Sequence, residues 1–409
     1  MKVNANRLWH RIRELHEIGP TGDGGVTRFS FTPEERAIKD RVAGFMQDAG
    51  LEVREDAVGN LIGRREGQDA SAAVVLVGSH LDSVPNGGDF DGPLGVLAAI
   101  EALAALEEAS VPTKHPIEVV AFTDEEGARF RFGMTGSRGI AGILTNADID
   151  DHADANGMTI RDAMRAAGFD PDAIATAALD PRTVKGYIEL HIEQGKVLEQ
   201  AGQAVGIVSG IAGPLWLKFT LEGEAGHAGT TPMTGRRDAL AAAAELLLVI
   251  EREAGRMTRT VGTVGQLQVQ PGGVNIIPGR VEFTLDLRDV DVAVRDEVEQ
   301  SIVMNAQTIC NERGISLQVD TLQRVQPVMC NEQLQGLMRE AAMELGQDAP
   351  TVVSGAGHDG MQFADKWPVG MLFARSKNGV SHHPDEYTSE ADCALAANVL
   401  LGTIVRFAN

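Results

Sequence analysis

The sequence has few cysteines, few aromatic residues and fewer basic than acidic residues. Its three cysteines, Cys310, Cys330 and Cys393, are odd in number and widely spaced, and no Cys-x-x-Cys pair occurs. This pattern disfavours a disulfide framework and is typical of a reducing compartment. Aromatic residues make up 4% of the chain against 43% hydrophobic residues, so the core of these 409 residues must be largely aliphatic.

The charge balance and the apolar runs exclude several classes of partner. Lys and Arg number 36 and Asp and Glu number 58, which gives a net charge of −22. Binding to nucleic acid or to an anionic membrane needs a basic surface, so we expect neither partner. The most apolar helical stretch, 239–250, contains Glu245 and is too short to span a bilayer. Residues 1–10 lack an apolar signal core, and we therefore expect a cytoplasmic protein.

The order of strands and helices predicts an α/β protein with a parallel or mixed sheet. A buried strand at 73–78, a helix at 93–109 and a second buried strand at 117–123 form a βαβ unit. The end of the chain returns to this pattern, with a strand at 368–374 and a helix at 389–407.

The middle of the chain has a different order, β-α-β-β-α-β, which is the ferredoxin-like pattern. Its expected elements are strands at 215–222, 260–269, 280–287 and 315–322, and helices at 238–254 and 293–313. We therefore predict a large mixed-sheet catalytic domain formed by residues 1–212 and 327–409. A smaller α+β domain, residues 213–326, is predicted to be inserted into it.

Polar residues follow the first buried strand. His80 and Asp82 are two residues apart, so in extended chain they share a face, and the carboxylate can orient a metal-bound imidazole. A capped strand end explains the same residues. Asp91 lies in a glycine-rich segment just before a helix, where it is either a helix N-cap or a metal ligand.

Three adjacent acids, Asp124, Glu125 and Glu126, follow the second buried strand. A solvated turn tolerates such a run. A metal ion would remove the repulsion and permit a division of labour, in which one glutamate binds the ion and its neighbour takes a proton from water.

Histidines supply the remaining candidates. His191 and Gln194 share a face if their segment is helical, and His382 and His383 are adjacent in a loop after a strand. Three histidines and two carboxylates at strand ends suit two metal ions bridged by one carboxylate. Mixed nitrogen and oxygen ligands suit zinc, with manganese, cobalt or nickel possible.

Seven segments together resemble one family along essentially the whole chain and in the family's order: GSHLDSVPNGGDFDGPLGV, FTDEEGARF, GYIELHIEQG, GHAGTTPM, VNIIPG, DLRD and VSHHPDE. The sequence is similar to the hydantoinase/carbamoylase branch of the dinuclear-metal aminoacylase and carboxypeptidase families. That branch includes N-carbamoyl-L-amino-acid hydrolases, β-ureidopropionases and allantoate amidohydrolases. The resemblance implies an aminopeptidase-like catalytic domain and an inserted ferredoxin-like domain that acts as a lid and forms a homodimer.

The resemblance also implies a ligand set for two divalent ions per subunit. In it Asp91 bridges, His80 and His191 hold one ion, and Glu126 and His382 hold the other. His382 is favoured over its neighbour because the family pattern reads Ser-His-x-Pro. The resemblance further makes Glu125 the general base and Asp82 the residue that orients His80.

Further residues would bind the substrate. Considered one at a time, His227 and Asn275 are typical of turn residues, and Arg288 is typical of a surface ion pair. The resemblance implies that all three close over the substrate across a dimer interface. His227 would stabilise the oxyanion, and Arg288 would pair with the substrate carboxylate, with hydrogen bonds added by Asn275 and Gln194. Gly357 would present its main-chain N–H in a loop at 355–360.

Together with these residues, the resemblance implies a metal-dependent hydrolase of the carbamoyl C–N bond of N-carbamoyl-L-amino acids, which yields the amino acid, carbon dioxide and ammonia. The motifs do not separate this small-molecule ureido acid from the substrates of allantoate amidohydrolase or β-ureidopropionase. A non-catalytic binding protein on the same fold is the alternative of a different class.

Overall fold

The computed structural model describes residues 1–409, and its contacts divide into two units. The first unit contains Met1–Ser209, Cys330–Ser354 and His358–Asn409. The second contains Gly210–Met329 and Gly355–Gly357. The chain thus passes between units near residues 209 and 330, and the boundaries expected from the sequence were 212 and 327. The short segment 355–357 was not expected to group with the second unit.

A nine-stranded mixed sheet forms the centre of the first unit, in the order β1-β2-β4-β3-β5-β15-β6-β13, with β14 paired to β6. Its four central strands, β4, β3, β5 and β15, are parallel to one another. The strands are β1 (Glu52–Glu55), β2 (Leu61–Arg65), β3 (Val74–His80), β4 (Ile117–Phe122), β5 (Val184–Ile192), β6 (Val205–Ile211), β13 (Val328–Met329), β14 (Thr351–Ser354) and β15 (Val369–Ala374).

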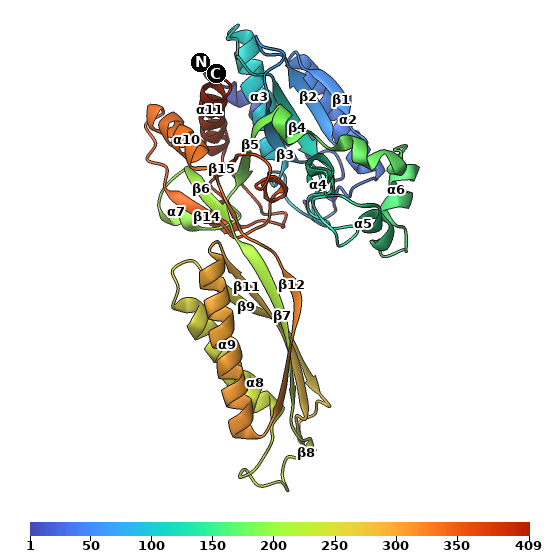
Figure 1. Ribbon diagram of the computed structural model, residues 1–409, viewed down its shortest axis with the longest axis vertical. Coiled ribbons are helices and arrows are strands. Elements are labelled where there is room, and N and C mark those ends of the chain that lie inside the picture. The colour runs from blue at the N-terminus through green and yellow to red at the C-terminus, as the bar shows by residue number, and fades with distance from the viewer. The chain divides into compact units, whose positions relative to one another are not determined.

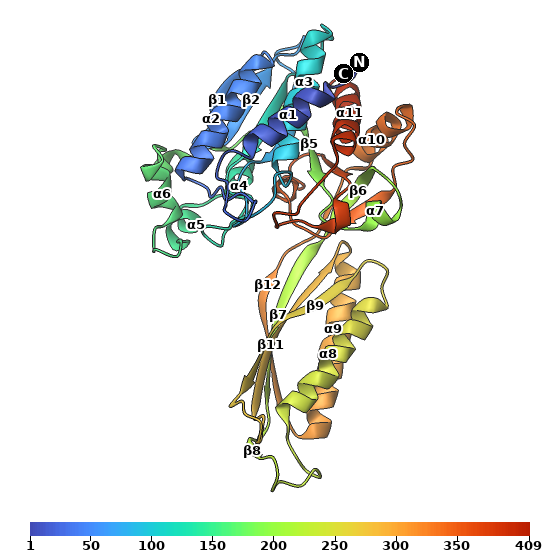
Figure 2. The ribbon, with the colours of Figure 1, turned by 180° about the vertical axis from the view of Figure 1, so that it is seen from behind.

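Helices cover both faces of this sheet, which is why β3, β4 and β15 are buried along their whole length. One face packs against α3, which contacts β3 and β5, and against α11, which contacts β15 (Figure 1). Helix α1 packs against both α3 and α11 (Figure 2). Because α3 is rich in alanine and leucine, it is buried on nearly every side. The helices of this layer are α1 (Ala5–Leu15), α2 (Pro33–Asp48), α3 (Pro93–Glu108), α10 (Glu332–Glu344) and α11 (Glu390–Phe407).

The opposite face of the sheet carries a smaller aromatic core that contains Phe122, Tyr187 and Phe363. Short elements cover it and extend the unit: α4 (Thr135–Ala141), α5 (Asn146–Asp151), α6 (Ile160–Ala166) and 3₁₀ turns at Pro171–Ala177, Pro181–Thr183 and Asp359–Gln362. A helix α7 (Val197–Gln200) and a 3₁₀ turn at Lys377–Gly379 lie in the loops after β5 and β15.

The second unit has a four-stranded antiparallel sheet in the order β12-β7-β11-β9. Helices α8 and α9 lie side by side against one face of it (Figure 2). This is the β-α-β-β-α-β order expected from the sequence. Its elements are β7 (Gly213–Glu222), α8 (Ala239–Gly255), β9 (Val261–Gln270), β11 (Arg280–Asp289), α9 (Val292–Arg313) and β12 (Ser316–Arg324), with a small pair of strands β8 (Gly226–His227) and β10 (Ile276–Ile277).

Strand β11 shows the alternation that makes one face of this sheet a core. Val281, Phe283, Leu285 and Leu287 are buried against the helices, and the residues between them are half-buried. Arg288 belongs to this second set, so its side chain is on the face that the helices leave open.

The segment that carries His191 is the buried strand β5, so the helical geometry that would place His191 and Gln194 on one face is not present. No helix in the structure is both long and apolar enough to cross a membrane.

Candidate metal centre and active site

The parallel strands of the first unit end at one edge of the sheet, and each of the four central strands brings a polar side chain there. His80 is the last residue of β3, and His191 lies at the end of β5. Glu126 follows β4 in the next turn, His382 follows β15, and Asp91 comes from the loop between β3 and α3. Residues far apart in the sequence therefore meet because their strands are neighbours in the sheet.

These five side chains form two groups that share Asp91: His80–Asp91–His191 and Asp91–Glu126–His382. Asp91 Oδ1 is 3.4 Å from His80 Nε2 and 3.2 Å from His191 Nε2. Asp91 Oδ2 is 3.5 Å from His382 Nε2, which is also 3.5 Å from Glu126 Oε1. One oxygen of Asp91 thus faces each group, as a carboxylate that bridges two ions would.

Main-chain carbonyls hold two of the imidazoles. His80 Nδ1 donates to the carbonyl of Asp82 at 3.1 Å, and His191 Nδ1 donates to the carbonyl of Ile192 at 2.9 Å. Both rings therefore keep the lone pair of Nε2 free to bind a metal ion. Gly92, with φ of +83°, leaves room for the His80 ring, because a Cβ there would lie 2.5 Å from the ring atoms.

Asp82 acts differently from the sequence-based expectation. Its carboxylate is 3.6 Å from His80 Nδ1, too far for a hydrogen bond, and its main-chain carbonyl takes that position. The carboxylate instead accepts the N–H groups of Glu125 and Glu126, each at 3.1 Å. Asp82 therefore fixes the turn that presents the two glutamates.

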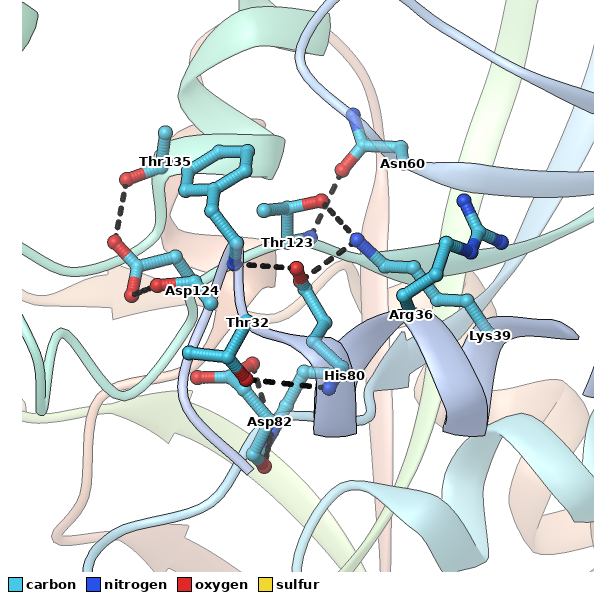
Figure 3. A network of polar contacts seen from close by, with 12 residues as sticks. Thr32, Arg36, Lys39, Asn60, His80, Asp82, Thr123, Asp124 and Thr135 are labelled. Atoms are coloured by element: carbon cyan, nitrogen blue, oxygen red, sulfur yellow. Dashed lines mark hydrogen bonds and ion pairs between the residues drawn. The ribbon is translucent and has the colours of Figure 1, made fainter. Parts of the chain in front are cut away.

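Asp124, the first of the three adjacent acids, is directed away from the ligand group. Its backbone is left-handed, with φ of 58°, and its carboxylate accepts the hydroxyls of Ser30 at 2.5 Å and Thr135 at 2.9 Å (Figure 3). Burial and the nearby Asp82 raise the pKa of Asp124 to about 7. Only the next two residues, Glu125 and Glu126, remain available to the site.

A buried network fixes the beginning of this turn. Lys39 Nζ donates to Glu35 at 2.7 Å and to the hydroxyl of Thr123 at 3.0 Å, and Asn60 accepts the Thr123 N–H at 3.0 Å (Figure 3). Because these partners are buried and hydrogen-bonded, the turn after β4 has little freedom to move.

The electrostatics of the site favour bound cations. Burial and the neighbouring Asp91 raise the pKa of Glu126 to about 8. Burial, together with Asp359 and Glu126, raises the pKa of Glu125 well above its usual value, although His80 opposes this shift. Burial alone would also raise the pKa of Asp91, but His191 and His80 hold it well below its usual value. A divalent cation between these carboxylates would relieve their mutual repulsion.

The donor set fits such ions. His191 Nε2 is buried and has no hydrogen-bond partner, although it points at Asp91. Leaving a buried polar atom unsatisfied costs about 1–3 kcal/mol, and an ion in the His80–Asp91–His191 group would satisfy it. The mixture of imidazole and carboxylate ligands suits zinc or manganese.

Several residues at this site were not identified from the sequence. The Ser381 hydroxyl is 2.7 Å from Asp91 Oδ2 and 2.8 Å from Glu386 Oε2. His358 is buried, with its ring centroid 4.6 Å from that of His191. Ser381 and Glu386 belong to the same VSHHPDE segment as His382, and that proximity in sequence is the signal by which they could have been found. The exposed His383 belongs to neither ligand group.

Gln194, which is expected to bind substrate, contacts the proposed metal ligand Asp91. Its Nε2 donates to Asp91 Oδ2 at 2.6 Å, while its Oε1 is buried without a partner. Its backbone is left-handed, with φ of 57°. Such a conformation is uncommon outside glycine and is found at functional sites.

The other expected substrate-binding residues, His227, Asn275, Arg288 and Gly357, belong to the second unit. His227 Nδ1 accepts the N–H groups of Gly229 at 3.1 Å and Thr230 at 3.2 Å, so Nε2 carries the proton and can donate it. The main-chain carbonyl of Asn275 accepts the main-chain N–H of Ala228 at 2.9 Å.

The Arg288 guanidinium is held in a fixed orientation within the second unit. It pairs with Asp286 through Nε at 2.9 Å and Nη2 at 2.7 Å, and its Nη1 donates to the carbonyl of Gly355 at 2.7 Å.

A cavity of about 540 Å³ in the first unit lies outside the ligand group, although Glu386 is among its lining residues.

Known proteins that are similar to this chain in sequence and in fold belong to the same group of hydrolases. The model of peptidase family M20/M25/M40 matches residues 76–406. The chain is 56% identical to an N-carbamoyl-L-amino acid amidohydrolase of Geobacillus stearothermophilus, with 99% of both chains covered. It is 37% identical to an allantoate amidohydrolase of Bacillus subtilis, with 98% of each covered. A hydantoinase/carbamoylase family amidase from Burkholderia multivorans superposes with a TM-score of 0.94 at 36% identity, covering 100% of this chain and 98% of that one.

Proposed function

Because the chain belongs to peptidase family M20/M25/M40 and is a hydrolase of its hydantoinase/carbamoylase type, we propose that it cleaves N-carbamoyl-L-amino acids. Water splits the bond between the carbamoyl carbon and the amino-acid nitrogen, and the carbamic acid released breaks down to carbon dioxide and ammonia. The observation that carries the proposal is the 56% identity over 99% of an amidohydrolase with this substrate in its name.

Hydrolases of this family depend on metal, and the proposed centre takes two divalent ions, zinc or manganese, with cobalt or nickel also suited to these ligands. His80 and His191 would hold one ion, Glu126 and His382 the other, and Asp91 both. When bound, such ions supply Lewis-acid activation of water and of the ureido carbonyl.

Glu125 is the proposed general base. It is buried beside the ligand group, with Oε2 3.8 Å from His80 Nε2. Its carboxylate takes a proton from the attacking water and delivers it to the amino-acid nitrogen as the C–N bond breaks. Burial raises the pKa of Glu125, so its carboxylate, once ionised, is a stronger base than a solvent-exposed one. Asp82 supports this role because it fixes the main-chain N–H of Glu125.

The second unit supplies the proposed contacts to the substrate. His227 donates from Nε2 to the oxyanion of the tetrahedral intermediate. Arg288 pairs with the carboxylate of the small-molecule substrate, since its planar guanidinium matches that group. Asn275 and the main-chain N–H of Gly357 add hydrogen bonds, and Gln194 of the first unit adds another. The protein is proposed to act in the cytoplasm as a homodimer with inserted domains that serve as lids, and to bind neither nucleic acid nor membrane.

Allantoate amidohydrolase is the second candidate function, since the chain is 37% identical to a relative of that name over 98% of both chains. β-Ureidopropionase shares the ureido and carboxylate groups. A non-catalytic binding protein is disfavoured, because the ligand group and Glu125 are both present at the strand ends.

A substrate panel separates these functions. The protein is loaded with Mn²⁺ or Zn²⁺, and kcat/KM is measured for N-carbamoyl-L-methionine, allantoate and N-carbamoyl-β-alanine. The proposal expects the N-carbamoyl-L-amino acid to be preferred. A preference for allantoate would establish the second candidate in its place, and a protein that binds metal but turns over none of the three would contradict both.

A further inference from the structure

The three imidazoles of the ligand group are not held in the same way. The rings of His80 and His191 are buried and donate to main-chain carbonyls. The side chain of His382 is 49% exposed, and its Nε2 lies 3.5 Å from both Asp91 Oδ2 and Glu126 Oε1, farther than the carbonyl contacts of the other two rings. Its backbone is left-handed, with φ of 56°, which costs free energy in a residue with a side chain. The position of His382 therefore depends on what holds its loop.

Glu386, four residues further along that loop, is buried and provides the anchor. Its Oε1 accepts the main-chain N–H groups of Phe90 at 2.9 Å and Asp91 at 3.0 Å. Its Oε2 lies 2.8 Å from the hydroxyl of Ser381, the residue just before His382. A single carboxylate thus connects the main chain of the bridging ligand to the loop that carries His382.

The packing around Glu386 is built for this contact. A Cβ at Gly88 would lie 2.4 Å from both Cβ and Oε1 of Glu386, so the carboxylate rests against bare main chain. On the outer side, the ring of Tyr387 packs at 5.9 Å from Phe90 and at 6.2 Å from Trp9. The residues next to Glu386 and Asp91 therefore pack together as well.

We propose that Glu386 is a positioning residue of the metal centre, which sets the separation of His382 from Asp91 and so controls the ion held by Asp91, Glu126 and His382. The inference rests on the proposed two-ion centre. The ion held by His80, Asp91 and His191 depends much less on Glu386, because both of its imidazoles have their own carbonyl partners. Loss of the carboxylate should consequently weaken the binding of one ion and spare the other.

The test compares Glu386→Ala and Glu386→Gln with the parent. In Glu386→Gln the amide oxygen can still accept the two N–H groups while the amide nitrogen donates to Ser381, so a smaller effect is expected. Glu101→Gln is the matched control: Glu101 is fully buried in the same unit and is bound by Arg7 and the N–H of Asn4, away from the ligand group. Circular dichroism verifies that each variant is folded.

The readouts are Mn²⁺ per subunit by mass spectrometry after dialysis, dissociation constants by chelator competition, and the absorption spectrum on stepwise addition of Co²⁺. Removing a residue that supports metal ligands typically costs about 10–100-fold in metal affinity. Glu386→Ala is expected to keep one tightly bound ion while the second weakens by that factor, and added Mn²⁺ should restore its turnover. The Glu101→Gln control should keep two.

Two results would overturn the proposal: Glu386→Ala binding two ions with the parent's affinities, or losing both ions to the same extent. If Glu386→Ala does not fold, Glu386→Gln and Ser381→Ala are read by the same criteria, and unchanged binding of the second ion in both would contradict the inference. A parent protein that binds no metal would refute the proposed two-ion centre itself, which distinguishes that failure from this one.

Discussion

Replacement of Glu125 by glutamine removes the proposed base and little else. The two side chains have nearly the same shape, and Glu125 is buried, so the amide fits the same space. The main-chain N–H of Glu125, which Asp82 accepts, is unchanged by the substitution. Glu125 belongs to neither ligand group, so both groups remain complete.

The expected loss of kcat in Glu125→Gln follows from the role of Glu125 as general base. A positioned general base contributes typically about 10²–10⁴-fold to the rate, which is about 3–5.5 kcal/mol at about 1.4 kcal/mol per tenfold. We expect kcat for N-carbamoyl-L-methionine to fall by that factor while Mn²⁺ per subunit stays at the parent value. Because burial and neighbouring carboxylates disfavour the ionised form of Glu125, the metal-free variant should be at least as stable to heat as the parent.

Asp124→Asn is the matched control, since Asp124 lies in the same turn but binds Ser30 and Thr135 away from the centre. It should retain most of its turnover. A Glu125→Gln variant that is folded and metal-loaded, yet turns over at nearly the parent rate, would refute the assignment of Glu125 as the base. Loss of metal from that variant would show instead that Glu125 is a ligand.

Two further predictions concern the ions and the pH. Asp91→Ala should lose both ions, because both ligand groups contain Asp91, whereas His382→Ala should keep one; mass spectrometry after dialysis measures this, and equal losses in the two variants would contradict a bridging role. In the metal-free protein, burial and Asp91 raise the pKa of Glu126 to about 8, whereas the pKa of a glutamate in the unfolded chain is about 4.3. Between these two pH values the folded state binds more protons than the unfolded state, so the folded state loses stability as the pH rises. Its melting temperature should therefore fall as the pH rises from 6 to 8, and bound Mn²⁺ should abolish the fall; a melting temperature that rises over this range without metal would contradict the sign.

Much of the site could be predicted because its chemistry coincides with clear strand ends. The segments before His80 and Glu126 are continuous apolar runs, which identify buried parallel strands, and ligands collect where such strands end. The five predicted ligand side chains do lie together in the structure. The family and hydrolase class inferred from the motifs are confirmed by the comparisons.

Strand β5 was missed for a physical reason. It contains Glu189 and His191, both buried, and Glu189 accepts the hydroxyl of Ser79 at 2.9 Å. Buried polar residues that are satisfied by tertiary contacts interrupt the apolar run that marks a parallel strand. The segment does alternate, with Ile188, Leu190 and Ile192 apolar, but that alternation favours a strand with one solvated face and not the strand buried on both faces that the structure has.

Side-chain roles that depend on main-chain direction could not be predicted either. The main-chain carbonyl of Asp82 binds His80, and its carboxylate binds the turn after β4. The His-x-Asp pattern does not tell which of these two groups of Asp82 faces the histidine. Gln194 reaches Asp91 because its backbone is left-handed, and no sequence pattern marks that conformation.

The central claim is that His80, Asp91, Glu126, His191 and His382 together hold two ions. A crystal structure of the Mn²⁺-loaded protein, with anomalous scattering recorded near the manganese absorption edge, tests it most directly. The account predicts two anomalous peaks about 3.5–4 Å apart, each within bonding distance of one Asp91 oxygen. A single peak, or peaks bound by other residues, would contradict it.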